Sequence, residues 1–207
     1  GEGERANADN IIKGLREAAK DKNTKGIILN INSPGGSPVQ SANVYDEIRR
    51  LKQSQPEMPI YAVVGDICAS GGYYIAAASD KIFVNQASLI GSIGVIMNGF
   101  GFTHVLDKLG VERRLLTAGE HKAMLDPFSP AKPQETQHMQ SLINQVHQQF
   151  ISAVKQGRGD RLQESHASEV FSGLVWTGAE GIKLGLADEL GSVDSVSRHV
   201  LGVEEQV

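Results

Sequence analysis

A serine flanked by small residues, Ser70, is the strongest candidate for chemistry in this chain. It follows an apolar segment at 59–64 that predicts a strand, and it precedes two glycines and the apolar run 73–78, which predicts a helix. The first turn of a helix presents unpaired backbone N–H groups, and the helix dipole adds positive potential there. This setting suits a nucleophile whose attack on a carbonyl creates an oxyanion. A serine that only caps the helix would give the same pattern, so the motif alone leaves both interpretations open.

A second glycine-rich turn, S-P-G-G at 33–36, lies between a predicted buried strand at 26–32 and a predicted helix at 38–53. Gly35 and Gly36 can present free N–H groups to a bound anion. An ordinary Pro-Gly turn would have the same sequence, so this motif also has two interpretations. A dinucleotide phosphate loop is disfavoured because the G-x-G-x-x-G spacing is absent.

A serine nucleophile needs a proton acceptor. The loop that follows a predicted strand at 111–116 offers two adjacent candidates, His121 and Lys122. The other histidines lack a glycine or a strand end beside them, and a solvated imidazole is their expected state. A lysine can act as a base when burial disfavours its ammonium form. Its ordinary state is a solvated surface side chain, so the residues alone do not choose between the candidates.

Apolar strand segments alternate with amphipathic helices, which predicts an α/β fold with a largely parallel sheet flanked by helices. The predicted strands are 26–32, 59–64, 81–84 and 111–116. The predicted helices are 5–21, 38–53, 73–78, 102–109, 133–156, 178–186 and 193–201. Because sites gather at the carboxyl ends of parallel strands, Ser70, Ser92 and the turn at 33–37 are expected on one rim of the sheet. No linker or repeat interrupts the pattern, so a single catalytic domain over residues 1–207 is predicted.

The composition is typical of a folded globular protein, with 40% apolar and 21% charged residues. A net charge of −4 gives no electrostatic reason to expect a nucleic-acid partner. The single cysteine, Cys68, excludes an intrachain disulfide. No apolar run reaches the ~18–20 residues that span a bilayer. The first four residues lead at once into a predicted helix, so we expect the native N-terminus to lie upstream.

Four turns taken together resemble the signal peptide peptidase A (SppA) family of serine proteases. They are C-A-S-G-G-Y-Y at 68–74, G-S-I-G-V at 91–95, S-P-G-G at 33–36, and G-E-H-K at 119–122 with D-P-F at 126–128. The resemblance extends from about residue 5 to residue 200. Agreement of four separate turns in identity and spacing makes it specific.

The resemblance implies a ClpP/crotonase-like fold and a Ser/Lys catalytic dyad. Ser70 is then the nucleophile and Lys122 the general base, and the hydroxyl of Ser92 orients the lysine amine. The backbone N–H groups of Gly35 and Gly71 then form the oxyanion hole. The histidine beside the base becomes a neighbour without a catalytic role, and no metal or cofactor is expected.

The resemblance also implies partners and a location. Family members carry a membrane anchor and an opening strand before the first helix, and we expect both to lie outside this sequence. The expected location is the bacterial cytoplasmic membrane, with the catalytic domain on the extracytoplasmic side. The expected substrates are unfolded or hydrophobic peptides, including released signal peptides, and self-association into a homo-oligomer is expected.

Two other classes of function compete with a serine endopeptidase. A crotonase-type acyl-CoA enzyme uses a similar fold with glycine-lined N–H pairs, but it usually moves protons with carboxylates. Only Asp66 lies near Ser70 in the sequence, and no site for coenzyme A is evident. A non-catalytic oligomeric scaffold is disfavoured because both Ser70 and Lys122 are retained. An endopeptidase that works through an acyl-enzyme is therefore the favoured prediction.

Overall fold

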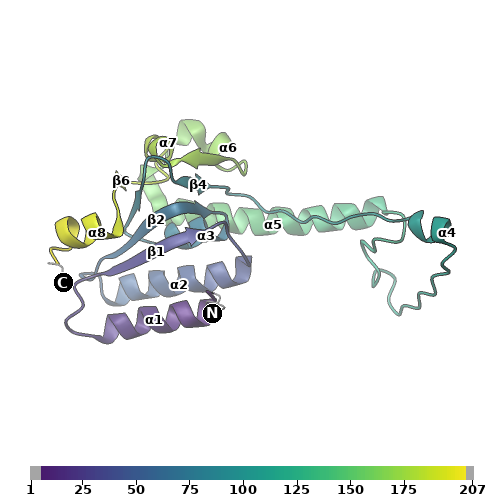
Figure 1. The fold of residues 1–207 in the computed structure, drawn as a ribbon, viewed down its shortest axis with the longest axis horizontal. Coiled ribbons are helices and arrows are strands. Elements are labelled where there is room, and N and C mark those ends of the chain that lie inside the picture. The colour runs from purple at the N-terminus through teal and green to yellow at the C-terminus, as the bar shows by residue number, and fades with distance from the viewer. Residues whose placement is uncertain (1–5, 204–207) are drawn as a thin grey trace. The chain divides into compact units, whose positions relative to one another are not determined.

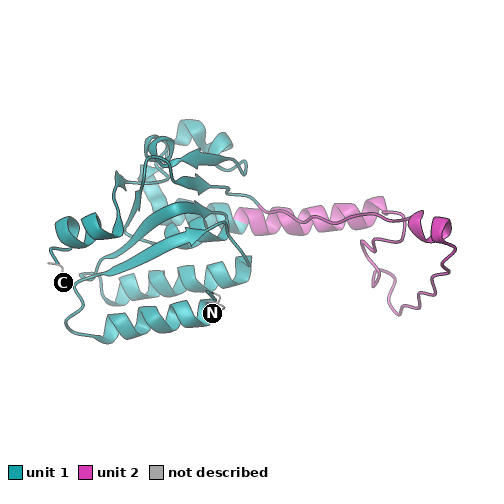
Figure 2. Cartoon of the chain, viewed as in Figure 1, with its two compact units in different colours: residues 1–94, 149–207 teal, residues 95–148 magenta. Residues whose placement is uncertain are grey.

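The computed structural model describes residues 6–203. The chain forms two compact units, shown in Figure 2: unit 1 comprises residues 1–94 and 149–207, and unit 2 comprises residues 95–148. The single catalytic domain over 1–207 stays a prediction, and the first residue of the predicted helix at 5–21 lies outside the described residues.

Unit 1 is built on a six-stranded sheet with the order β5-β4-β2-β3-β6, and β1 also pairs with β2. All pairs are parallel except the pair of β4 with β5. The strands are β1 (Ile27–Ser33), β2 (Ile60–Ala69), β3 (Lys81–Val84), β4 (Leu89–Gly91), β5 (Val175–Thr177) and β6 (Glu189–Leu190). The predicted class, a largely parallel sheet flanked by helices, is confirmed.

The main helices of unit 1 begin with clear capping signals. In α1 (Ala8–Lys20) the side chain of Asn7 accepts a hydrogen bond from the N–H of Asn10, and in α2 (Pro38–Ser54) Ser37 caps the helix ahead of a proline at its first position. The two helices lie side by side next to β1 and β2 (Figure 1). The shorter helices are α3 (Gly71–Ala76), α6 (Ala167–Val170), α7 (Gly178–Lys183) and α8 (Val193–Ser195), the last continuing as a π-helix at 196–200.

A buried carboxylate joins α1 to α2. Glu47 is 5% exposed and accepts hydrogen bonds from Arg16 at 2.8 and 3.0 Å and from Arg50. The hydrogen bonds from Arg16 and then Arg50 lower the pKa of Glu47 to about 2, against the opposing effect of its burial. Both arginines are about half exposed, so the cluster fixes the two helices at the edge of the core rather than within it.

The long helix α5 (Pro133–Arg158) contributes residues 149–158 to unit 1. Phe150 and Val154 are buried in the main core, and Arg158 is 1% exposed. The guanidinium of Arg158 donates to the carbonyl of Gly185 at 2.8 Å and to both carboxylate oxygens of Asp188 at 2.7 and 2.9 Å. Burial acts to raise the pKa of Asp188, but the hydrogen bonds and charge of Arg158 outweigh it and hold this pKa below its ordinary value. The buried pair therefore anchors the end of α5.

Unit 2 contains α4 (Val105–Leu109), an extended segment and residues 133–148 of α5. The predicted helix at 102–109 is confirmed over its second half. The predicted strand at 111–116 is wrong: these residues are exposed and pair with no described strand. A strand needs a neighbour for its backbone groups, and this segment has none among the described residues of the unit. None of the described helices has the length and apolar character needed to cross a membrane.

The strand that leads to Ser70 is longer than predicted. The expected turn after residue 64 is instead part of β2, which continues to Ala69. This extension places Ser70 directly after the last residue of the strand. The short strands β4, β5 and β6 were not predicted. The predicted helix at 178–186 is present in shortened form as α7, and α8 with the π-helix covers 193–200 of the predicted 193–201.

Candidate active site

Ser70 lies between the end of β2 and the start of α3 with a strained backbone. Its φ of 50° and ψ of −122° form a combination that residues with a side chain rarely adopt. Its N–H donates to the carbonyl of Gly91 at 2.9 Å, and its carbonyl accepts from the N–H of Tyr74 at 2.9 Å. The side chain makes no capping hydrogen bond, so the interpretation of Ser70 as a simple helix cap is wrong.

The two glycines predicted for the oxyanion hole lie against Ser70. A Cβ atom on Gly35, whose φ is +119°, would lie 2.8 Å from the Cβ of Ser70 and 3.1 Å from the backbone nitrogen of Gly71. A Cβ on Gly71 would lie 2.5 Å from the Oγ of Ser41 and 3.1 Å from the nitrogen of Gly36. Only glycine fits this approach of the two turns. The sequence prediction that the S-P-G-G turn and the Ser70 turn meet therefore agrees with the geometry.

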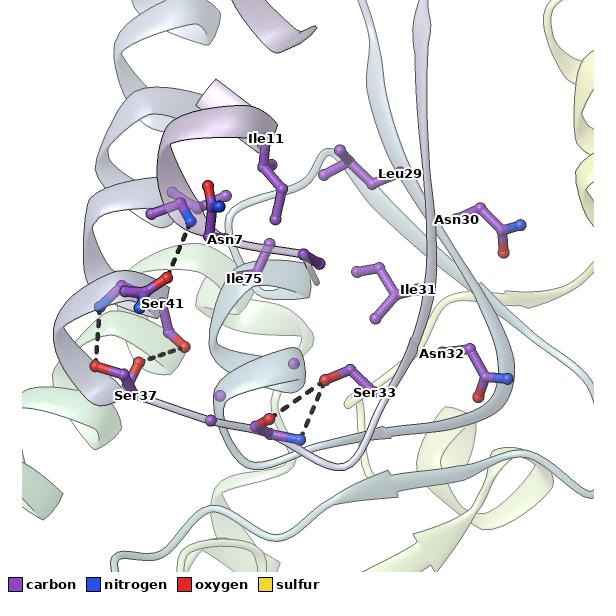
Figure 3. A pocket seen from close by; sticks show the side chains of 18 of the residues that line it. Asn7, Ile11, Leu29, Asn30, Ile31, Asn32, Ser33, Ser37, Ser41 and Ile75 are labelled. Atoms are coloured by element: carbon purple, nitrogen blue, oxygen red, sulfur yellow. Dashed lines mark hydrogen bonds between the residues drawn. The ribbon is translucent and has the colours of Figure 1, made fainter. Parts of the chain in front are cut away.

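The two predicted oxyanion donors differ in their present partners. Gly71 is the first residue of α3, so its N–H has no acceptor within the helix. The N–H of Gly35 donates to the Oγ of Ser33 at 3.2 Å, as Figure 3 shows. An oxyanion that binds here would replace the Ser33 hydroxyl as the acceptor for this N–H. The N-terminus of α2, which begins beside Ser37, adds positive potential at the same turn.

Ser92 occupies the place after β4 that Ser70 occupies after β2. The last residues of the two strands, Ala69 and Gly91, are paired in the parallel ladder. Ser92 has the same φ of 50°, and its N–H donates to the carbonyl of Leu174 at 2.8 Å. Two serines with matching strained backbones thus follow adjacent strand ends on one rim of unit 1.

Lys122 belongs to unit 2, whereas Ser70 belongs to unit 1. Its side chain is exposed, and its N–H donates to the carbonyl of Gly119 at 3.2 Å. The neighbouring His121 lies with Nδ1 3.6 Å from the buried carboxylate of Glu135, which also accepts a hydrogen bond from Lys132. Burial acts to raise the pKa of Glu135, but these two partners outweigh it and lower the pKa. The role of Lys122 as base stays a prediction.

A cavity of about 440 Å³ opens beside the two glycine turns in unit 1. Besides glycines of both turns, its lining includes the aliphatic side chains of Ile11, Leu29, Ile31 and Ile75 and polar residues such as Asn7, Gln40 and Ser41. Figure 3 shows that these aliphatic side chains point toward the cavity, whereas Asn30 and Asn32 point to the other side of β1. The cavity was not predicted, although the alternation of aliphatic and Asn residues along β1 indicates that one face of this strand is covered.

Two further observations bear on the chemistry. Cys68 is fully buried, and burial raises the pKa of its thiol, which makes it an inert core residue rather than a second nucleophile. No group of three or more His, Cys, Asp or Glu residues in the described part of the chain could hold a metal ion.

The largely parallel sheet flanked by helices defines a fold class, the ClpP-like fold. Residues 52–203 match peptidase family S49, and residues 1–91 match the Clp protease family. Because the first match covers well over half of the sequence, the chain belongs to peptidase family S49. The resemblance inferred from the four turns is therefore confirmed.

Relatives with curated names share this region. The chain is 43% identical to part of the Na(+)/H(+) antiporter NhaA of Brucella melitensis, over 91% of this chain and 25% of that protein. It is 33% identical to Protease 4 of Haemophilus influenzae, over 91% of this chain and 30% of that protein. It is 30% identical to the chloroplastic serine protease SPPA of Arabidopsis thaliana, over 90% of this chain and 27% of that protein. The chain spans from 25% to 64% of the length of the curated relatives it matches.

Proposed function

We propose that this serine peptidase is an endopeptidase that uses Ser70 as nucleophile and Lys122 as general base. The observation that carries the proposal is the strained, uncapped Ser70 at the end of β2, packed against Gly35 and Gly71. Backbone strain of this kind persists where the surrounding structure enforces it, and it is concentrated at active sites. A serine hydroxyl beside two backbone donors is the arrangement that acyl transfer requires.

The proposed reaction has two halves. The Oγ of Ser70 attacks the peptide carbonyl carbon while the neutral amine of Lys122 takes the hydroxyl proton, and the N–H groups of Gly35 and Gly71 receive the oxyanion. The C–N bond then breaks, and the lysine ammonium returns the proton to the leaving amine. Water next attacks the acyl carbonyl and gives a proton to Lys122. The ester bond to Oγ then breaks, and Lys122 returns that proton to the Oγ of Ser70, which frees the acid and restores the enzyme. The Ser92 hydroxyl orients the lysine amine throughout.

We further propose that the substrates are apolar peptide segments, such as released signal peptides or unfolded chains. The support is the cavity next to Gly36 and Gly71, whose lining includes several aliphatic side chains and which is large enough for an apolar side chain of an extended peptide. Peptides that differ only in one side chain near the cleaved bond test this directly. Preference for large aliphatic residues supports the proposal, and preference for charged residues contradicts it.

Self-association is a separate proposal. Unit 2 exposes large apolar side chains, including Ile96, Phe100, Leu109 and Leu116, at 69 to 96%. Burial of such side chains between copies of the chain would stabilise an oligomer. The apolar side chains along α5, Met139, Leu142, Ile143, Val146 and Phe150, do not form one exposed stripe: Phe150 is buried in unit 1, whereas Leu142 is 39% exposed. A monomeric mass by light scattering at micromolar concentration would contradict this proposal.

Membrane attachment is also proposed for the whole protein, with this domain on the extracytoplasmic side of the bacterial cytoplasmic membrane. Its support is the family resemblance, and cell fractionation with protease accessibility tests it.

For the chemistry, the test is a fluorophosphonate probe, which forms a covalent bond with activated serines. Labelling of Ser70 together with peptide cleavage supports the endopeptidase, whereas turnover of an acyl-CoA without peptide cleavage would favour the crotonase-type alternative.

A further inference from the structure

The strand that leads to Ser70, β2, contains a bulge a few residues before its end. The register of β1 on β2 runs in step up to the pair of Ile31 with Val64 and resumes at the pair of Ser33 with Cys68. Between these pairs β1 has one residue and β2 has three. The two extra residues in β2 leave backbone N–H and C=O groups without hydrogen-bond partners in the sheet. Where such groups are buried or half-buried, they need other partners.

Asn32 supplies those partners from β1. Its Oδ1 accepts a hydrogen bond from the N–H of Ile67 at 3.1 Å, and its Nδ2 donates to the carboxylate of Asp66 at 3.1 Å. A Cβ on Gly65 would lie 3.3 Å from both Cβ and Cγ of Asn32, so the side chain lies directly against the bulged backbone. One amide thus contacts all three residues of the bulge.

Ser88 holds the bulge from the opposite edge of β2. At this point β2 changes its neighbour, because it pairs with β3 up to Val63 and with β4 from Ile67 onward. Ser88 lies between β3 and β4, is 2% exposed, and donates its hydroxyl to the carbonyl of Gly65 at 2.6 Å. The same hydroxyl accepts from the N–H of Asn85 at 3.0 Å, so its direction is fixed.

We infer that Asn32 and Ser88 are positioning residues for the nucleophile. Ser70 lies three residues beyond Ile67, and side chains alternate between the two faces of a strand, so a slip of the bulge by one residue would turn the nucleophile away from its site. Asn32 is also followed at once by Ser33, whose hydroxyl holds the N–H of Gly35. One side chain therefore sets the register between the strand of the nucleophile and the turn of the oxyanion donors. This inference rests on the proposed role of Ser70.

Asn30 provides a matched control for Asn32. It lies two residues earlier on the same strand, points to the same side in Figure 3, and is exposed. Its side chain makes no hydrogen bond to any residue in the described part of the chain. A general effect of replacing an exposed Asn on β1 would therefore be the same for both residues, whereas a positioning role belongs to Asn32 alone.

The test measures the rate constant for acylation of Ser70 by a fluorophosphonate in the complete chain. Asn32→Ala is expected to slow acylation about 30-fold or more, because displacement of a reacting atom by about 1 Å costs up to about 100-fold, whereas Asn30→Ala changes it by less than about twofold. Asn32→Asp is also expected to be slow, because its carboxylate faces that of Asp66. Adding Asp66→Asn to Asn32→Asp restores the pair with donor and acceptor exchanged, and acylation is expected to recover to within about threefold of the original rate.

Rescue by the exchanged pair distinguishes a positioning role from a simple loss of stability, and so does a comparison of the effects on kcat and on KM. With a peptide substrate, Asn32→Ala is expected to lower kcat and leave KM within about twofold. An unchanged acylation rate in Asn32→Ala overturns the inference, and so does a lower melting temperature with full activity of the folded protein. If Asn32→Ala fails to fold, Ser88→Ala serves instead, with an expected loss of about fivefold or more. Labelling that survives Ser70→Ala contradicts the proposed function itself, whereas Ser70-dependent labelling with an unaffected Asn32→Ala contradicts the inference alone.

Discussion

Replacement of Gly35 by alanine tests the contact between the oxyanion turn and the nucleophile. The backbone of Gly35 has a φ of +119°, which costs a residue with a side chain about 1–3 kcal/mol. The added Cβ would lie 2.8 Å from the Cβ of Ser70, well inside ordinary van der Waals contact, and overpacking of this kind costs about 1–3 kcal/mol more. The free energy of unfolding should therefore fall by about 2–6 kcal/mol.

The larger effect is expected on chemistry. To relieve the clash, Ser70 or the turn at 33–36 must move by several tenths of an ångström, and the N–H of Gly35 moves with the turn. We expect the rate constant for acylation of Ser70 by a fluorophosphonate to fall about 100-fold. Labelling quenched at successive times measures the acylation rate constant, and a thermal unfolding curve identifies the temperature range in which the variant is folded.

Gly36→Ala is the matched control. A Cβ on Gly36 has no heavy atom within 4 Å, and its backbone does not adopt a positive φ. The acylation rate of Gly36→Ala should stay within about threefold of the original. Equal rates in the Gly35→Ala and Gly36→Ala proteins would refute the contact and, with it, the assignment of Gly35 to the oxyanion hole.

Three further predictions concern the base, the cavity and the helix pair. Lys122→Arg should lose peptide hydrolysis as completely as Lys122→Ala, because arginine stays protonated at any working pH, and an active arginine variant in a peptide assay would show that another group is the base. Ile11→Phe should shift kcat/KM toward peptides with smaller apolar side chains by about tenfold, and an unchanged preference would exclude the cavity as a substrate site. Glu47→Gln should lower the free energy of unfolding at pH 7 by about 1–3 kcal/mol in urea titrations, since screening at the half-exposed arginines limits the loss. Because the pKa of Glu47 is lowered to about 2 from its ordinary 4.5, this contribution is present above pH 4.5 and is lost as the pH falls toward 2, so the difference between the two proteins should shrink there.

Local patterns predicted the longer strands and helices of unit 1. Their alternation and the expectation that two glycine turns share one rim with Ser70 follow from short stretches of sequence. Gly65 and Asp66 misled the prediction because both residues favour turns. In the structure they form a bulge within β2 that Asn32 stabilises from a strand more than thirty residues earlier. Local propensity contains no information on such a partner.

The segment 111–116 shows the opposite error. Its apolar ends favour a strand, but no described strand pairs with it, and Leu116 is 96% exposed. The cavity near Ile75 and the hydrogen bond between Ser33 and Gly35 were also out of reach, because both depend on how α1, β1 and α3 pack. Spacing along a chain identifies candidate groups, whereas their partners are set by contacts between distant segments.

The proposed chemistry is acylation of Ser70 with the help of Lys122. Mass spectrometry tests it after brief exposure of the protein to a peptide ester substrate and acid quenching, which traps an acyl-enzyme as a mass increase on one peptide. An adduct is expected on the peptide that contains Ser70 and none in the Ser70→Ala protein, with a rate of formation at least about 100-fold lower in Lys122→Ala. An adduct on any other residue, or an undiminished rate without Lys122, would rule this chemistry out.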